Sequence, residues 1–343
     1  MDRVRVLLLF GGESSEHDVS ISSARNVYAA IDEEQYDTTL CYIDRNGKWW
    51  LIDSFDREII IENAIQLLPM LGVGGFVTQP GGKTIHPDVL FAVLHGRNGE
   101  DGTVQGLAQL LHIPIVGCDI TASVVAMNKL TTKEVLLANG ISVSPYTVHR
   151  SYQDIPDFGS LTMNFGNPLF VKPARSGSSI GVSKVYTASE FHDALEQAHH
   201  EDDIVLIEKS VQGKELEVGV LGVLPKHRAS GVGQVIPGDT FYSYDDKYSK
   251  DSSAVVTTQA DITDAQMAEV QALALRVFEI LDCRGLARID FLLSQDGRLD
   301  VLEVNTLPGF TNISMYPKLW RQQGMSYTEL ISALLNDATI RSR

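Results

Sequence analysis

The sequence predicts an α/β protein of two or three domains, and three observations support this prediction. The chain has 343 residues, which is more than one ordinary hydrophobic core accommodates. Continuous apolar runs that predict buried parallel strands alternate with segments of helical periodicity. Hydrophobic residues make up 44% of the chain and charged residues 21%, as is typical of a folded soluble protein.

The N-terminal third contains three predicted buried strands, at residues 6–10, 38–43 and 89–94. The first ends in Gly11-Gly12, which favours a tight turn after the strand. A stripe at helical spacing lies between the first two strands and consists of Ala24, Val27, Tyr28 and Ile31. This alternation predicts a small open α/β domain up to about Cys118.

The middle of the chain alternates helices and strands around a Gly/Ser-rich loop. Residues 119–140 have a mostly helical pattern, and strands are predicted at residues 168–172, 182–185 and 203–208. A capping box over residues 187–190 predicts the start of a further helix.

The C-terminal third begins with a long polar segment, residues 237–256, which is rich in tyrosine and predicts a loop or lid. A second capping box at residues 263–266 opens a predicted helix that stops near Gly285. Its predicted buried stripe consists of Met267, Val270, Ala274, Val277 and Leu281.

Charge and cysteine content exclude several classes of function. The formal net charge of −16 argues against nucleic acid and anionic membranes as partners, so any anionic ligand needs a local cluster of lysine and arginine. The three cysteines, Cys41, Cys118 and Cys283, are far apart and predict reduced packing residues rather than disulfides or a zinc site. The apolar run at residues 6–10 is too short for a membrane span or a secretory signal, so we expect a cytoplasmic protein.

A predicted β-hairpin near the C-terminus carries a cluster of polar side chains. Residues 286–293 and 299–304 are separated by Asp296-Gly297, a favoured two-residue turn. Because side chains alternate along a strand, Ala287, Ile289 and Phe291 share one face, and Arg288 and Asp290 lie together on the other. Pairing across a two-residue turn then sets Asp290 opposite Glu303 and Arg288 opposite Asn305.

Opposed carboxylates repel one another unless a cation lies between them. Carboxylate and amide oxygens suit Mg²⁺, which completes its shell with water and phosphate. A solvated hairpin face would also carry charges, but Arg288, Asn305 and the rigid turn that ends at Gly309 favour a metal site.

The segment Lys172-Pro-Ala-Arg-Ser-Gly-Ser-Ser-Ile-Gly181 joins two predicted strands, and its small residues allow backbone N–H groups to approach a phosphate. A flexible hairpin would have the same composition, and the segment lacks the Walker pattern. The turn at Gly11-Gly12 lacks the dinucleotide-binding fingerprint. Individually, Lys129 fits a surface lysine and His95 a structural histidine; together with the hairpin and the Gly/Ser loop, these residues describe a Mg-ATP site.

These segments resemble the D-alanine–D-alanine ligases of the ATP-grasp superfamily, nearly from end to end. The motifs that carry the resemblance are Gly11-Gly-Glu-Ser-Ser-Glu-His-Asp-Val-Ser20, His95-Gly-Arg-Asn-Gly-Glu-Asp-Gly102, Met127-Asn-Lys129, Lys172-Pro-Ala-Arg-Ser-Gly-Ser-Ser179, Phe241-Tyr-Ser-Tyr-Asp-Asp-Lys-Tyr248, Ala287-Arg-Ile-Asp290 and Glu303-Val-Asn-Thr-Leu-Pro-Gly309. Residues 50–85 and 150–165 carry no motif.

The resemblance implies a three-domain ATP-grasp fold, with ATP between the central and C-terminal domains. The implied domains are an N-terminal Rossmann-like open α/β domain over residues 1–118, a central subdomain over residues 119–209, and a C-terminal domain over residues 210–343 that includes the lid at 237–256.

The resemblance also implies an ATP site. The implied phosphate contacts are Lys129, Lys172 and Ser179, with Lys247 reaching the transferred phosphate. The implied adenine and ribose contacts are Glu208, Lys209, Val211 and Glu215. Two Mg²⁺ ions, for which Mn²⁺ can substitute, are implied at Asp290, Glu303 and Asn305.

For the amino-acid substrates, the resemblance implies that Glu16 binds the ammonium group of the first D-alanine, with His95 nearby. The resemblance further implies that Ser178 and Tyr248 form a hydrogen-bonded link with Glu16 that closes the lid. The implied oxyanion contacts are Arg288 and the backbone of Gly309, and the implied contacts of the second D-alanine's carboxylate are Ser314 and Met315.

The implied activity is the ATP-dependent joining of two D-alanines through an acylphosphate, for peptidoglycan precursor synthesis in the cytoplasm, by an enzyme that is usually a homodimer. Tyr248 favours D-alanine as the second substrate, and D-serine or D-lactate stays an alternative. A glutathione-synthetase-like ligase and a nucleotide-binding regulator without catalysis are further alternatives. Glu16 argues against the first of these, and Arg288 with the metal-type ligands argues against the second.

Overall fold

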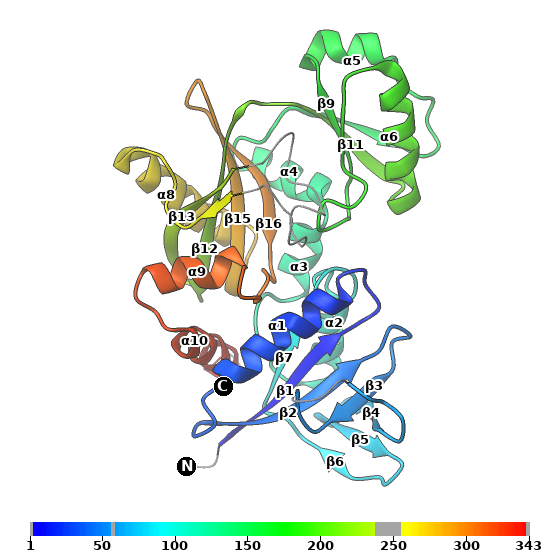
Figure 1. Ribbon diagram of the computed structural model, residues 1–343, viewed down its shortest axis with the longest axis vertical. Helices are drawn as coiled ribbons and strands as arrows, with labels where there is room; N and C mark the ends of the chain where they lie inside the picture. Colours follow the sequence, from blue (N-terminus) through cyan, green and yellow to red (C-terminus); the bar gives the residue numbers. More distant parts are fainter. Residues whose placement is uncertain (1–2, 56–58, 237–254, 341–343) are drawn as a thin grey trace.

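The computed structural model describes residues 3–55, 59–236 and 255–340 of the chain. Three sheets of seven, four and five strands follow one another along the sequence. Figure 1 shows the first sheet at the bottom of the molecule and the other two above it, side by side.

The first sheet has the strand order β6-β5-β4-β3-β2-β1-β7. β1 pairs in parallel with β2 and β7, and β3 to β6 extend the sheet with antiparallel pairing. The bounds are β1 (Val4–Gly11), β2 (Tyr36–Ile43), β3 (Trp49–Ile52), β4 (Ile65–Met70), β5 (Gly75–Gln79), β6 (Thr84–Ile85) and β7 (Val89–Val93). The three predicted strands are confirmed, whereas β3 to β6 have no counterpart in the sequence prediction.

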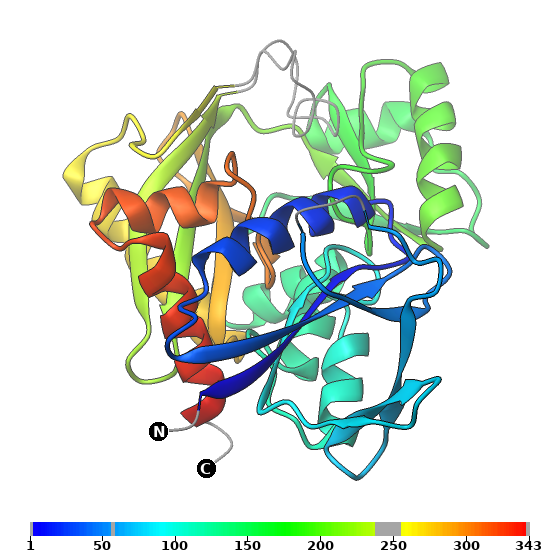
Figure 2. The same ribbon diagram turned by 60° about the horizontal axis from the view of Figure 1, so that its bottom comes forward.

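β1 lies between β2 and β7, and both of its faces are apolar and covered by helices. Leu8 and Phe10 share a hydrophobic cluster with α1 (His17–Ala30), which crosses the middle of the molecule in Figure 2. Leu7 and Leu9 point to the other face and pack with α2 (Thr103–Leu111). Because successive strand residues alternate faces, a continuous apolar run is what a doubly covered strand requires.

The second sheet has the antiparallel order β10-β9-β11-β8. Its strands are β8 (Tyr146–Arg150), β9 (Leu169–Pro173), β10 (Ser183–Val185) and β11 (Ile204–Lys209), and its helices are α5 (Phe158–Phe165) and α6 (Ala188–Glu201). The core of this part lies between the helices and β9 and β11, where Leu169, Phe191 and Val205 are buried. The strands predicted at residues 168–172, 182–185 and 203–208 are confirmed within two residues at each end.

The third sheet has the antiparallel order β14-β13-β12-β15-β16. Its strands are β12 (Gly213–Gly222), β13 (Arg228–Ile236), β14 (Val255–Thr257), β15 (Gly285–Ser294) and β16 (Leu299–Asn305), and it packs against α8 (Asp264–Ile280) and α9 (Met315–Gln322). The predicted stripe on α8 is buried at four of its five positions, and Met267 is partly buried. α8 ends at Ile280, and Gly285 begins the next strand.

Three helices connect the sheets. α3 (Ile120–Met127) and α4 (Lys129–Ala138) are separated by Asn128, which caps α4, and both share a hydrophobic cluster with the third sheet. α10 (Tyr327–Ile340) packs with α1 and with β7 of the first sheet, and also with β12 and β15 of the third sheet. Because helices link neighbouring parts in this way, the division into three domains at Cys118 and Lys209 stays a prediction.

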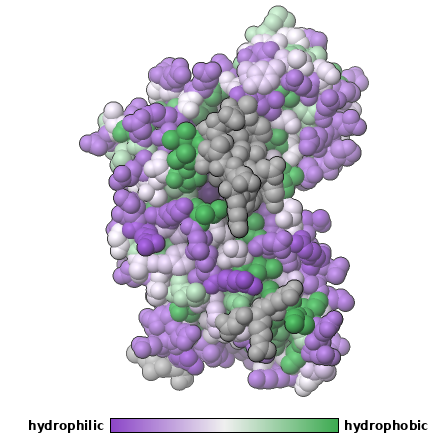
Figure 3. All heavy atoms as spheres, in the orientation of Figure 1, coloured by the Kyte–Doolittle hydropathy of each residue, from purple (hydrophilic) through white to green (hydrophobic). Residues whose placement is uncertain are grey.

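The outline of the face shown in Figure 3 is mainly hydrophilic and the three cysteines are buried, as expected from the composition of the chain. In the residues that the structure describes, no helix is long and apolar enough to cross a membrane. Cys41, Cys118 and Cys283 are buried and unbridged, as predicted.

The two predicted capping boxes differ in the structure. At the start of α8, the Thr263 side chain accepts from the Gln266 backbone and the Gln266 side chain accepts from the Thr263 backbone, so the box is complete. At the start of α6, Thr187 accepts from the Glu190 backbone, but the Glu190 carboxylate accepts from the backbone of Tyr186 instead. The box at the start of α6 therefore has only one of its two bonds.

Residues 237–254 of the predicted lid lie outside the described part of the chain. Val255 and Val256 already belong to β14, where Val256 pairs with Val235 of β13. The predicted loop therefore extends two residues too far, because an apolar pair at its end joins the edge of the sheet.

The pairing of β15 with β16 confirms the central prediction from the hairpin and corrects its turn. Asp290 lies opposite Glu303, and Arg288 lies opposite Asn305, as predicted. The turn, however, contains one residue more than predicted, because Ser294 rather than Gln295 bonds to Arg298 across it. A bulge between Asp290 and Phe291 offsets that extra residue, so the predicted partners meet.

Candidate active site

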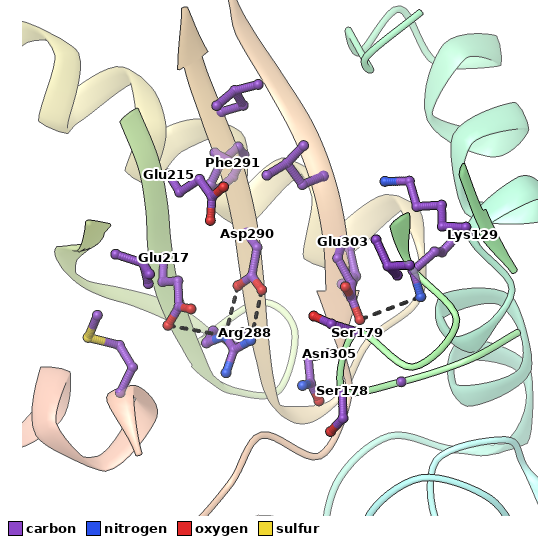
Figure 4. A pocket seen from close by; sticks show the side chains of 18 of the residues that line it. Lys129, Ser178, Ser179, Glu215, Glu217, Arg288, Asp290, Phe291, Glu303 and Asn305 are labelled. Atoms are coloured by element: carbon purple, nitrogen blue, oxygen red, sulfur yellow. Dashed lines mark hydrogen bonds and ion pairs between the residues drawn. The ribbon is translucent and has the colours of Figure 1, made fainter. Parts of the chain in front are cut away.

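A cavity of about 840 Å³ is lined by residues from all three parts of the molecule. Every predicted site residue that the structure describes lines it: Glu16, His95, Lys129, Lys172, Ser178, Ser179, Glu208, Lys209, Val211, Glu215, Arg288, Asp290, Glu303, Asn305, Gly309, Ser314 and Met315. Lys247 and Tyr248 lie outside the described residues. Figure 4 shows part of this cavity, where side chains of the third sheet face the Gly/Ser loop and Lys129.

On the face of the third sheet, the guanidinium of Arg288 lies among the carboxylates of Asp290, Glu217 and Glu303. We call these four residues the carboxylate cluster. Arg288 donates to both oxygens of Asp290 over 2.8 Å and lies 3.4 Å from Glu217 (Figure 4). Burial alone would lower the pKa of Arg288, but the charges of Asp290, Glu217 and Glu303 hold it well above its usual value. Arg288 therefore stays a cation in this cavity.

Glu217 belongs to the carboxylate cluster and was missed by the sequence analysis. It lies on β12, directly opposite Asp290 of β15, so that Asp290 has a carboxylate neighbour on each side. The two strands are separated by more than sixty positions in the chain, and no local pattern reveals their pairing. The strand alternation in β12 is the only available signal, because it leaves Glu215 and Glu217 on one face.

The donor set for a metal consists of two carboxylates and one amide. Asp290 and Glu303 are directly opposed, and Asn305 follows Glu303 on the same face of β16. Lys129 lies 3.8 Å from Glu303 and partly offsets its charge. Within the residues that the structure describes, no group of three His, Cys, Asp or Glu side chains is arranged to hold a metal. The oxygen donors present fit a hard cation that takes few protein ligands and completes its shell with water and phosphate.

Three charged side chains from α4, β9 and β11 form a second group, which we call the lysine cluster: Lys133, Lys172 and Glu208. The Glu208 carboxylate lies 2.7 Å from the Lys172 ammonium and 3.1 Å from that of Lys133. Burial would raise the pKa of Glu208, but the charges of the two lysines outweigh it and hold the pKa below its usual value. Lys133, which the sequence analysis missed, is 2% exposed and has a pKa lowered mainly by burial.

The Gly/Ser loop between β9 and β10 points into the cavity. Ser178 and Ser179 have left-handed backbone conformations, with φ of 50° and 60°. The hydroxyl of Ser178 donates to the Glu16 carboxylate, which joins the loop to the N-terminal part of the chain. At the base of the loop, the Arg175 guanidinium and backbone N–H both donate to the buried Asp202 carboxylate, over 2.5–3.0 Å.

Glu16 is buried beside the turn that follows β7. A side chain on Gly96 would place its Cβ 2.6 Å from a Glu16 carboxylate oxygen, so glycine allows the close approach. Glu100, also missed from the sequence, accepts from the Gly96 backbone and lines the same cavity. Burial and the nearby charge of Glu16 raise the pKa of Glu100 well above its usual value.

The His95 ring is held by Ser23 and by the backbone of Leu307. Its Nε2 lies 2.9 Å from the Ser23 hydroxyl, and its ring also bonds to the backbone of Leu307. Burial lowers the pKa of His95, although the charge of Glu16 and the Leu307 bond oppose that effect. Ser23 in turn accepts from the Phe310 backbone, so His95 and Ser23 anchor both sides of the turn that contains Gly309.

The remaining predicted residues lie at two ends of the cavity. Gly309 and Ser314 are in close contact, because a Cβ on Gly309 would be 2.6 Å from the Ser314 hydroxyl oxygen. That hydroxyl accepts from the backbone of Thr311, and Met315 begins α9 beside it. Glu215 and Val211 lie in and before β12, next to the end of β11.

Comparisons with known proteins cover the whole chain. The family models described as "D-ala D-ala ligase N-terminus" and "D-ala D-ala ligase C-terminus" match residues 5–118 and 135–336. The D-alanine–D-alanine ligase A of Chromobacterium violaceum is 42% identical over 357 aligned positions, which cover 100% of this chain and 97% of the relative.

Two solved structures are similar over nearly their full length. The D-alanine–D-alanine ligase from Coxiella burnetii matches with a TM-score of 0.89 and 32% identity, covering 100% of this chain and 95% of that one. The VanG D-Ala:D-Ser ligase from Enterococcus faecalis matches with a TM-score of 0.88 and 30% identity, covering 98% and 99%. These similarities confirm the predicted α/β ATP-grasp fold class.

Proposed function

Because the chain belongs to the D-alanine–D-alanine ligase family, we propose that it joins two D-alanines to D-alanyl-D-alanine at the expense of ATP. One observation carries the proposal beyond family membership. A single cavity contains the Glu16–Ser178 pair, two lysines of different parts of the chain, and the Arg288-bearing face of the third sheet. Such a site has separate groups for an ammonium, a polyphosphate and a developing oxyanion.

The nucleotide is proposed to lie between the second and third sheets. Lys129 and Lys172 supply charge to its phosphates, and Ser179 of the Gly/Ser loop, which lines the same cavity, is proposed to contact them as well. The adenine and ribose contacts proposed are the residues from the end of β11 to the start of β12: Glu208, Lys209, Val211 and Glu215. In this arrangement the side chain of Glu208 stays with the two lysines, so its contact with adenine is through the backbone.

Two Mg²⁺ ions, or Mn²⁺ in their place, are proposed at Asp290, Glu303 and Asn305. The support is the direct opposition of two carboxylates and the amide next to them on one sheet face. When bound, the metal neutralises charge on the phosphate oxygens during transfer. The protein's part is to hold the oxygen donors in place, and Arg288 and Lys129 limit the repulsion between them.

The first D-alanine is proposed to bind with its ammonium at Glu16 and with His95 behind the site. Its carboxylate attacks the γ-phosphate of ATP, so that an oxygen–phosphorus bond forms and ADP leaves. Catalysis of this step rests mainly on positioning and on charge neutralisation. Ser178 holds Glu16 by a hydrogen bond, and Lys247 and Tyr248, which lie outside the described residues, are proposed to act from the lid.

The second D-alanine is proposed to bind with its carboxylate at Ser314 and Met315. Its amine attacks the carbonyl of the acylphosphate, and the tetrahedral intermediate expels phosphate as the amide forms. Arg288 and the Gly309 backbone N–H are proposed to stabilise the negative oxygen of that intermediate. Arg288 must share its bonds with Asp290 to do so.

Three further features of the proposal concern the enzyme in the cell. The dipeptide supplies peptidoglycan precursor synthesis, and so cell wall formation and cell shape. The enzyme acts in the cytoplasm, and it forms a homodimer through its N-terminal part. The support for these features is the family's chemistry and the resemblance of the sequence.

A substrate panel tests the proposed activity. We expect phosphate release and dipeptide formation from D-alanine with ATP and Mg²⁺, and neither from L-alanine. Pairs of D-alanine with D-serine and with D-lactate decide between the alternatives for the second substrate, because the product mass identifies the joined partner. Phosphate release that needs no D-amino acid, or no release with D-alanine, would contradict the proposal.

A further inference from the structure

Lys133 is a buried lysine that does not line the cavity but pairs with Glu208, which does. It lies one helical turn after Lys129 on α4, so both side chains leave the helix on the same side. The Lys133 side chain is 3% exposed, and that of Lys172 is 15% exposed and lines the cavity. The two lysines therefore meet Glu208 from different directions: Lys133 from the protein interior and Lys172 from the ligand side.

The surroundings of Lys133 contain groups that hold a cation in place. Its ammonium lies 3.1 Å from Glu208 and 3.5 Å from the carbonyl oxygen of Ser144. It also lies 5.3 Å from the centre of the Tyr146 ring, within the range of a cation–π interaction. A charge that is buried this completely is stable only when it is paired, and Glu208 is its charged partner.

The charge balance of the lysine cluster is what gives Lys133 a part in nucleotide binding. Glu208 is 3% exposed and divides one negative charge between two ammonium groups. Without Lys133, the whole carboxylate charge would act on Lys172, which is the member that faces the cavity. A lysine whose charge is cancelled by a buried carboxylate attracts a polyphosphate less, because the net charge at that point falls from positive to neutral.

We propose that Lys133 is a positioning residue for the nucleotide: it takes up the charge of Glu208, so that Lys172 remains an effective cation for the phosphates of ATP. This inference rests on the proposed function, because it takes the cavity to be an ATP site. It adds a residue that touches no ligand and acts through Glu208 and Lys172.

The test is the affinity for ADP with Mg²⁺, measured by titration calorimetry without any amino acid, in the full chain and in Lys133→Met, Glu208→Gln and the double variant. We expect Lys133→Met to weaken ADP binding about tenfold, within the range of coupling between contacting charges. We expect the double variant to recover to within about threefold of the unchanged protein, because no carboxylate charge remains to be shared.

A matched control is Lys214→Met. Lys214 also pairs with a carboxylate, 2.9 Å away in Asp261, but both side chains are exposed. We expect this variant to bind ADP like the unchanged protein. Thermal unfolding of every variant reports whether it is folded at the temperature of the titration.

Two outcomes overturn the proposal. One is unchanged ADP affinity in a folded Lys133→Met variant, and the other is a tenfold difference between Glu208→Gln and the double variant. The second comparison decides the matter even if the single Lys133→Met variant does not fold. If the unchanged protein binds ADP but makes no dipeptide, the ligase proposal fails, and the role of Lys133 is still judged by these affinities.

Discussion

The lysine cluster and the carboxylate cluster line or support one cavity and carry net charges of opposite sign. The lysine cluster sets two ammonium groups against the single carboxylate of Glu208, whereas the carboxylate cluster sets the single guanidinium of Arg288 against three carboxylates. The first has a positive charge to spare for phosphates, and the second has negative charge to spare for metal cations. A chain with a net charge of −16 therefore provides both kinds of surface within one site.

The two clusters also differ in how their residues are brought together. The carboxylate cluster depends on the register of β12, β15 and β16, where alternate residues face the cavity. The lysine cluster joins a helix to two strands, and its members are separated in sequence by about forty residues each. Strand alternation makes the first partly visible in the sequence, and nothing local marks the second. Substitutions in each cluster, and control substitutions outside them, test this difference.

The largest effect is expected from removal of the one cation in the carboxylate cluster. Arg288→Met leaves Asp290, Glu217 and Glu303 without their guanidinium and removes the proposed oxyanion contact. We expect kcat for dipeptide formation to fall about 10²–10³-fold, as for loss of a comparable donor. The exposed Arg284→Met variant is the control, and a fall of less than tenfold in Arg288→Met would separate Arg288 from the chemistry.

The next effect concerns stability and its dependence on pH. The pKa of Glu208 is lowered in the folded protein, so its contribution to stability is present above about pH 4.3 and is lost as the pH falls through the folded pKa. Glu208→Gln also leaves the buried Lys133 and the partly buried Lys172 without this carboxylate, so we expect a loss of about 3 kcal/mol in unfolding free energy at pH 7.

Glu100 provides the opposite case in the same cavity. Its pKa is raised, so its contribution to stability is present below about pH 4.3 and is lost as the pH rises through the folded pKa. The unfolding free energy of Glu100→Gln, relative to that of the unchanged protein, should therefore rise between pH 4 and pH 7, by about 1 kcal/mol for each unit of pKa shift. Urea unfolding of both variants from pH 7 down to below the folded pKa of Glu208 checks the two signs, and parallel pH profiles would refute the contrast.

A smaller effect, on the Mg²⁺ requirement, distinguishes the proposed metal ligands from the other carboxylates of the cluster. Glu303→Gln is expected to raise the Mg²⁺ concentration for half-maximal phosphate release about 10–100-fold, because a proposed ligand loses its charge. Glu217→Gln removes an equal charge from the same cluster, but Glu217 is paired with Arg288 and is not a proposed ligand. We expect its Mg²⁺ requirement to change less than threefold. Equal shifts in both variants would mean that only the total charge matters.

The smallest effect tests whether ADP affinity and the Mg²⁺ requirement depend on the charges of the two clusters rather than on the stability of the whole protein. Thr263→Ala removes the complete capping box of α8, far from both clusters, and should lower the unfolding free energy by about 1 kcal/mol. Thr187→Ala, at the incomplete box of α6, should cost less. Neither change should alter ADP affinity or the Mg²⁺ requirement in a titration, and a change in either would show that these quantities follow overall stability.

The fold was predictable where a residue pattern depends on one element alone. The buried strand β1 follows from its apolar run, and the opposed Asp290 and Glu303 follow from strand alternation and the hairpin turn. The hairpin turn was predicted one residue too short, and the partners were still correct because a bulge offsets the difference. Such a bulge has no signal in a single sequence, since it arises from the fit of three strands.

The rest of the site depends on contacts between distant segments. Lys133 has the sequence of an ordinary helix-surface lysine, and only the packing of α4 against β11 buries it. Glu217 and Ser23 likewise gain their partners from strands and turns far along the chain. The strands β3 to β6 were missed because they are short antiparallel segments in a region, residues 50–85, that carries no motif.

The central claim is that this cavity activates D-alanine as an acylphosphate, and transfer of an oxygen isotope tests it most directly. D-Alanine labelled with ¹⁸O in both carboxylate oxygens would be incubated with the protein, ATP and Mg²⁺, and the released phosphate analysed by mass spectrometry. The account predicts one ¹⁸O atom in each phosphate and one phosphate for each dipeptide formed. Unlabelled phosphate, or phosphate without dipeptide, would contradict it.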